Sequence, residues 1–160
     1  MNRFRLAAAL TLALAAASTT EAAELKRQGT PAAIISSNVI VPPGATTAYV
    51  SGMTPPAISA AGAPPVYGDT KTQTMGVLKR IEDSLKAEGM SMNDVVMLRV
   101  FLVADPATKQ MDFAGMNAAY STFFGTAANP NKPSRITMQI VQLVNPAFLV
   151  EIEAQAAKLP

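Results

Sequence analysis

The C-terminal stretch 133–156 constrains the fold of this chain most, because apolar and polar residues alternate along it in two separate runs. The first run covers 135–140 and the second covers 150–155, with the breaker Asn145-Pro146 between them. A period of two is typical of a β-strand that has one buried face and one polar face. The pattern therefore predicts two half-buried strands joined by a turn.

A hairpin made from these two runs would place residues of equal parity opposite each other. A turn centred on Asn145 meets this condition and predicts that Ile140 lies opposite Val150 and Arg135 opposite Gln155. One face of such a hairpin is apolar. The other face would carry Arg135, Thr137, Gln139, Glu151, Glu153 and Gln155.

This polar face has two interpretations. It can be a solvated sheet face on which Arg135 forms a weak ion pair with Glu153. It can instead line a pocket in which the guanidinium binds a carboxylate and a glutamate handles a proton or a water. In the hairpin register Glu151 lies four residues from Arg135, about 13 Å along the strands. A functional pair would therefore require a site between two copies of the chain.

The composition excludes several kinds of site. The 160 residues suit one domain, and they include no cysteine and no histidine. Disulfides, thiolate or histidine metal sites and histidine-based catalysis are therefore excluded, and no metal is expected. The formal net charge is only +2 and there is no basic cluster, so the sequence predicts no nucleic-acid partner.

Residues 1–22 predict a secretory signal peptide. A basic start is followed by an apolar run at 6–17, which is shorter than the ~20 residues that a membrane span requires. We therefore expect cleavage near residue 22, export with the periplasm as the destination, and no membrane association afterwards. The mature domain would be 23–160.

The middle of the chain begins with two predicted strands and a helix. The runs 39–41 and 46–53 are rich in β-branched and aromatic residues, and we expect them to form a hairpin around Pro43-Gly44. A helix is expected over 70–88, because apolar residues recur there at helical spacing and Gly89 is suited to end it.

A second strand–helix unit follows. The nearly continuous apolar run 94–104 predicts a central strand covered on both faces, in which Arg99 would form an interface ion pair. Another helix is expected over 108–124. The whole order predicts a single α+β domain: one mixed sheet with two helices packed on one face, and a second subunit covering the other face.

Five segments carry a family resemblance. They are SGM at 51–53, KAEGMSMNDVVMLRVFLVA at 86–104, NAAYSTFFG at 117–125, Arg135, and VEIEA at 150–154. In this order and spacing they resemble the Rid family of reactive-intermediate deaminases, the YjgF-like proteins. The resemblance implies a chorismate-mutase-like α+β fold and a homotrimer with sites in the clefts between subunits. It implies no metal or organic cofactor.

The resemblance also implies roles for single residues. Arg135 would grip the carboxylate of the substrate, and Glu151 would handle the water as the catalytic residue. The other residues in contact with substrate would be Ser51, Gly52, Asn117 and Thr137. The family usually has a Gly-Pro-Tyr step near 35–38, whereas this chain has Ile-Ser-Ser-Asn there.

The hypothesis is therefore an exported 2-iminopropanoate/enamine deaminase that converts small amino-acid-derived imines to 2-oxo acids and ammonia. Its partners would be the small 2-imino or 2-oxo acid and two further copies of the chain. Two alternatives share the fold. One is a non-catalytic binder of small carboxylates, and the other is a structural or protein-protecting trimer whose cleft is vestigial.

Overall fold

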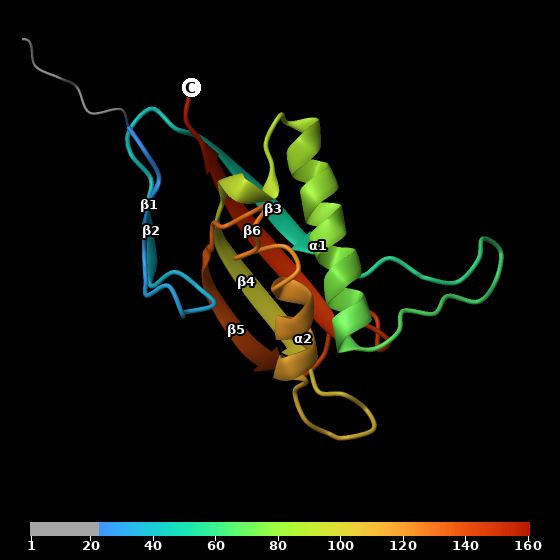
Figure 1. Ribbon diagram of the computed structural model, residues 1–160. Helices are drawn as coiled ribbons and strands as arrows, with labels where there is room; N and C mark the ends of the chain where they lie inside the picture. Colours follow the sequence, from blue (N-terminus) through green and yellow to red (C-terminus); the bar gives the residue numbers. More distant parts are fainter. Residues whose placement is uncertain (1–22) are drawn as a thin grey trace, which may run out of the picture.

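A computed structural model describes residues 23–160, so the predicted signal peptide lies outside the described residues. Figure 1 shows a twisted four-stranded sheet with both helices on one face and a small two-stranded sheet beside it. This is the mixed α+β architecture that the sequence predicts. The elements in chain order are β1 (Lys26–Gln28), β2 (Asn38–Ile40), β3 (Thr46–Met53), α1 (Thr70–Ala87), the 3-10 turn η1 (Met92–Asp94), β4 (Val95–Val103), α2 (Phe113–Tyr120), β5 (Ser134–Ile140) and β6 (Val150–Lys158).

The strand order of the main sheet is β3-β6-β4-β5, with β4 inside the sheet as predicted. β4 pairs in parallel with β5 and antiparallel with β6. The predicted β5–β6 hairpin is therefore wrong, although both strands form. The connection 141–149 is long enough to pass over one strand. Inserting β4 between β5 and β6 places the most apolar strand where both of its edges are hydrogen-bonded.

The predicted hairpin of 39–41 with 46–53 is also wrong. β2 pairs with β1, and β3 pairs with β6. Pro42 and Pro43 supply no backbone N–H between the two runs, which disfavours a tight hairpin. The β1–β2 sheet is tied to the body by Arg27, whose guanidinium donates hydrogen bonds to the carbonyl oxygens of Asn93 (2.9 Å), Val95 (2.9 Å) and Lys132 (3.3 Å).

The first helix closely follows its prediction. The Asp69 carboxylate caps α1 by accepting a hydrogen bond from the Thr72 N–H at 2.8 Å. At the other end Gly89 has φ +68°, a left-handed conformation that glycine adopts without strain. This lets the Met90 N–H donate back to the Leu85 carbonyl at 2.9 Å, which ends the helix.

The second helix is shorter than predicted. Residues 105–109 form a turn in which the Lys109 N–H donates to the Asp105 carbonyl at 2.8 Å, and Lys109 itself has φ +61°. α2 begins only after Asp112, whose carboxylate accepts from the Gly115 N–H at 2.8 Å. The first residue of α2 therefore lies about one and a half helical turns later in the sequence than predicted, at 3.6 residues per turn.

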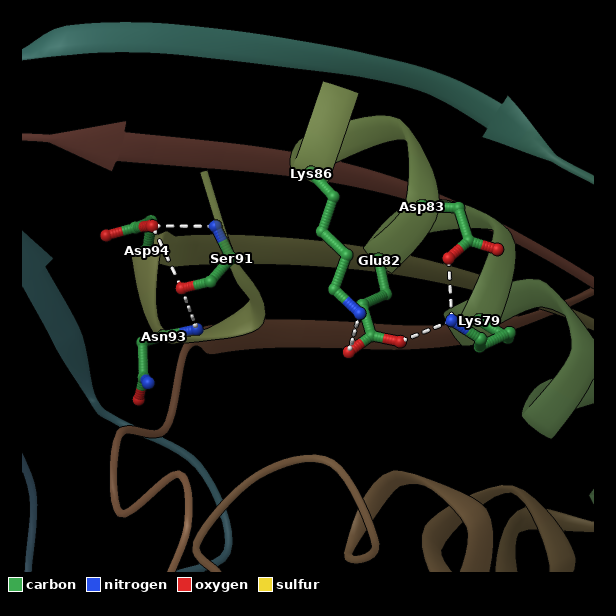
Figure 2. A network of polar contacts seen from close by, with 7 residues as sticks. All are labelled: Lys79, Glu82, Asp83, Lys86, Ser91, Asn93 and Asp94. Carbon is green, nitrogen blue, oxygen red and sulfur yellow. Dashed lines mark hydrogen bonds and ion pairs between the residues drawn. The ribbon is translucent and has the colours of Figure 1, made fainter. Parts of the chain in front are cut away.

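The outward surface of α1 and the turn before β4 carry two polar networks (Figure 2). On α1 the Lys79 ammonium contacts Glu82 at 2.8 Å and Asp83 at 2.6 Å, and Lys86 contacts Glu82 at 3.0 Å. At η1 the Asp94 carboxylate accepts from the Ser91 N–H at 2.8 Å, closing a capping box. These contacts stabilise the helix surface and the entry to the central strand.

The hydrophobic core lies between the helices and one face of the sheet. Its fully buried members include Val77, Leu78, Ile81, Leu85, Leu98, Val100, Leu102, Met116, Tyr120, Val150 and Ile152. Burial alternates along β4, so within one chain this strand is covered on one face only. The prediction of cover on both faces is therefore wrong for the isolated chain. Among residues 23–160, no helix has both the length and the apolar character that a membrane span needs.

Candidate functional site

The register of the sheet decides which face each predicted site residue occupies. Arg135 pairs with Leu98, a fully buried residue of the helix-covered face. Thr137 pairs with Val100 on the same face. Since directly paired residues point to the same side of a sheet, Arg135 and Thr137 lie between β5 and the helices.

The Arg135 guanidinium lies against side chains of α2. Its Cζ is 4.4 Å from the ring centroid of Tyr120 and 5.7 Å from that of Phe113, and one terminal nitrogen is 3.8 Å from the Met116 sulfur. Burial lowers the pKa of Arg135, and its attraction to Tyr120 partly offsets this. No ion pair of Arg135 with an acidic side chain occurs among residues 23–160. The side chain is thus a partly buried cation without a counterion.

Two buried polar atoms accompany this cation. The side-chain oxygens of Asn117, on α2, and of Thr137, two residues beyond Arg135, are buried without a hydrogen-bond partner. Leaving such a group unsatisfied costs about 1–3 kcal/mol, so a partner is expected. A ligand carboxylate would accept hydrogen bonds from the guanidinium, and a ligand N–H or a water could donate hydrogen bonds to these two oxygens.

The second group of predicted residues lies on the opposite face. Glu151 pairs with Phe101, whose side chain points away from the helices. At Gly52 an added Cβ would lie 3.0 Å from the Glu151 Cδ and 3.2 Å from its Cγ. Gly52 has no positive φ. The absence of a side chain at Gly52 therefore lets the Glu151 side chain lie directly against the backbone.

Ser51 belongs to this second group. Here the pairing of β3 with β6 is interrupted by a bulge between Val50 and Met53. Ser51 lines a shallow hollow of about 180 Å³ on the uncovered face, together with the exposed Tyr49 and the ion pair of Arg99 with Glu153 at 3.2 Å. Arg99 does form an ion pair, but its partner Glu153 belongs to the same chain, so the expected interface contact stays a prediction.

The six predicted site residues therefore form two groups: Arg135, Thr137 and Asn117 on the helix-covered face, and Ser51, Gly52 and Glu151 on the uncovered face. The expectation that Arg135 and Glu151 share a face is wrong, because β4 lies between their strands and its register places them on opposite sides. Two strand spacings and three register positions separate them, which is about 14 Å. A compact site with both residues would need a second copy of the chain.

Sequence reasoning missed three contributors to the first group, namely Phe113, Met116 and Tyr120. Tyr120 is 1% exposed and belongs to the hydrophobic core. Its spacing from Met116 on α2 gives no sign that both face a cation on a distant strand. In the part of the chain that the structure describes, no group of three acidic side chains gathers to hold a metal ion.

Comparison with known proteins identifies relatives over most of the chain. The family model described as "Endoribonuclease L-PSP" matches residues 31–158. A RutC family protein of Pyrococcus horikoshii is 42% identical over 94 residues, which are 58% of this chain and 66% of that protein, a little under two thirds of its length. A RutC family protein of Sulfurisphaera tokodaii is 36% identical over 113 residues, covering 70% of this chain and 80% of the relative.

Solved structures show the same architecture. The Rid protein YyfB from Yersinia pestis matches with a TM-score of 0.60 at 26% identity, covering 78% of this chain and 87% of that one. TdcF of E. coli, solved with bound serine, matches with a TM-score of 0.56 at 25% identity, covering 83% and 98% of the two chains.

Proposed function

Since this chain belongs to the Rid (YjgF-like) family, we propose that it binds small imines or enamines derived from amino acids and hydrolyses them to 2-oxo acids and ammonia. The observation that carries this proposal is the partly buried Arg135 guanidinium, which has aromatic neighbours but no acidic partner among residues 23–160. TdcF was solved with bound serine, a ligand that carries a carboxylate next to a nitrogen-bearing carbon. That ligand chemistry supports the same substrate class here.

The proposed reaction adds water across a C=N bond. The guanidinium holds the carboxylate of the 2-imino acid in a two-pronged hydrogen bond, which fixes the neighbouring imine carbon. Water adds to that carbon, and the resulting carbinolamine releases ammonia and leaves the 2-oxo acid. Such positioning can lower the barrier by several kcal/mol. A carboxylate that takes a proton from the water adds about 10²- to 10⁴-fold.

We propose that Glu151 of a neighbouring copy supplies this carboxylate. Within one chain it lies on the other sheet face and about 14 Å from Arg135. A homotrimer would bring the two groups together and would also cover the open sheet face, where Tyr49 is 77% exposed. Asn117 and Thr137 would then find partners in the substrate or in an ordered water.

The runner-up function is a non-catalytic binder of small carboxylates. It would use the same cleft and the same Arg135 guanidinium, but it would not require Glu151 for turnover. Substitutions in this protein can distinguish the two functions, because in our proposal ligand binding depends on Arg135 and turnover depends on Glu151.

The decisive experiment measures ammonia and 2-oxo-acid release from 2-iminopropanoate, generated by an amino-acid oxidase, with and without the purified protein. We expect Arg135→Ala to lose both turnover and pyruvate binding, and Glu151→Gln to lose turnover while binding persists. Arg80→Ala, at an exposed arginine of α1 that donates to the Thr54 carbonyl, is the matched control. Binding without any turnover in the wild type would favour the runner-up. Unchanged binding and turnover in Arg135→Ala would refute both.

A further inference from the structure

We propose that Tyr120 is a positioning residue: the face of its ring holds the Arg135 guanidinium in the orientation that binds a carboxylate, without neutralising its charge. This inference rests on the proposed function of Arg135 as the carboxylate grip. It assigns a role to a residue that touches the arginine rather than the substrate.

The Tyr120 ring is itself held in place by two contacts besides its own helix. It stacks on Phe124 with 4.9 Å between ring centroids and 30° between ring planes. Its hydroxyl donates a hydrogen bond to the Ile34 carbonyl at 3.0 Å, so the segment before β2 fixes the far end of the ring. With 1% of the residue exposed, the ring has little freedom to rotate.

The contact between ring and cation is close. The Arg135 Cζ lies 4.4 Å from the Tyr120 centroid, well inside the range of about 6 Å in which a ring face attracts a cation. Phe113 is farther away at 5.7 Å and is 40% exposed, so its contribution is smaller and its ring is less constrained. Tyr120 therefore forms the main support of the guanidinium.

A neutral support has a chemical consequence that an acidic one would lack. An acidic side chain at the same place would occupy the hydrogen-bond fork of Arg135 and would compete with the carboxylate of a ligand. A ring face attracts the cation but accepts none of the fork's paired hydrogen bonds. Burial raises the pKa of Tyr120 to about 12, so the phenol stays uncharged at neutral pH. The full positive charge remains available to an anion.

Three substitutions distinguish the effect of the Tyr120 ring from the effect of its hydroxyl and from the effect of lost core packing. Tyr120→Phe keeps the ring and removes the bond to Ile34, whereas Tyr120→Leu removes the ring. Leu85→Ala is the packing control, since Leu85 is 1% exposed in the same core and lies on α1, outside the contacts of Tyr120 and Arg135. For each variant we would measure pyruvate binding by calorimetry and KM and kcat for 2-iminopropanoate.

We expect Tyr120→Leu to raise Kd and KM by roughly tenfold with a smaller change in kcat, because substrate binding loses its oriented cation. Tyr120→Phe should restore Kd to within about twofold of the wild type, because its ring face still supports the cation. Leu85→Ala should also lower Tm while Kd stays near the wild-type value. Equal Kd values for folded Tyr120→Leu and Leu85→Ala would overturn the inference.

If Tyr120→Leu does not fold, a measurement on the wild-type protein still tests the positioning role of Tyr120. Protons of Arg135 above the ring face should show an upfield ring-current shift in NMR spectra, identified by their loss in Arg135→Lys. Absence of that shift overturns the positioning role even if pyruvate binds. A clear shift with no pyruvate binding would instead refute the proposed function and leave the ring–cation contact standing.

Discussion

Replacing Gly52 by alanine should impair the proposed reaction while leaving the fold intact. An added Cβ at Gly52 would lie 3.0 Å from the Cδ of Glu151 and 3.2 Å from its Cγ, and the nearer carboxylate oxygen would be closer still. The backbone has no positive φ there, so alanine itself fits the local conformation. Only the glutamate side chain has to move.

The size of the effect follows from that movement. Restoring ordinary contact distances requires the carboxylate to shift on the order of 1 Å, and a misplacement of that size can cost about 10²-fold in rate. The free energy of unfolding should change by less than about 1 kcal/mol, because alanine also restricts the unfolded chain and offsets some of the crowding. Pyruvate binding should be unchanged, because in the proposed site Arg135, and not Glu151, binds the carboxylate.

The assay is a double-mutant cycle of Gly52→Ala and Glu151→Gln on 2-iminopropanoate hydrolysis, with Thr47→Ala at an exposed position of the same strand as control. If alanine acts by displacing Glu151, the double variant should be no slower than Glu151→Gln alone. Rate losses that multiply would refute the reasoning. So would a folded Gly52→Ala protein with wild-type kcat.

Three further predictions concern stability and export. Leu98→Ala, at a fully buried position of β4, should lower the free energy of unfolding by about 2–5 kcal/mol in urea titrations. Hydrogen bonds from Lys79 and then Lys86 lower the pKa of Glu82 below 4.5. The resulting stabilisation is present above the unfolded-state pKa and is lost as pH falls through the lowered folded-state value. Glu82→Gln should therefore cost a few tenths of a kcal/mol at neutral pH and progressively less as acidification protonates Glu82 in the folded protein. We also propose that the protein is exported and cleaved near residue 22. Amino-terminal sequencing of protein from the periplasmic fraction should find a mature chain that begins near residue 23. A full-length chain in that fraction would contradict the proposed cleavage.

Much of the secondary structure could be predicted because each signal was local. The spacing of apolar residues and Gly89 located α1, and the long apolar run at 94–104 located the central strand. Pairing was harder to predict, because alternation identifies a strand and its two faces but not its neighbour. The connection 141–149 allows either a hairpin or a crossing over β4, and the burial of β4 decided between them.

In the candidate site, too, some features could be predicted from the sequence and others depend on tertiary structure. The residue types and their expected roles came from the family resemblance, and the roles stay predictions. The distribution of these residues over two faces depends on the register of β4 with β5 and β6. The contact between Arg135 and Tyr120 depends on how α2 packs on β5. The fit of Glu151 against Gly52 depends on a bulge in β3. Each of these is a tertiary feature, so neither periodicity nor composition could predict it.

Through Arg27, the segment 23–29 contacts parts of the fold that are distant in the sequence. Its guanidinium holds backbone oxygens of Asn93 and Val95, at the start of the central strand, and of Lys132, just before the strand of Arg135. Proteolysis that removed residues 23–29 would leave those three carbonyls without this donor. Cleavage after residue 29 could therefore loosen the end of β5 that carries Arg135, and it should weaken the proposed ligand affinity without altering any of the proposed ligand-binding residues.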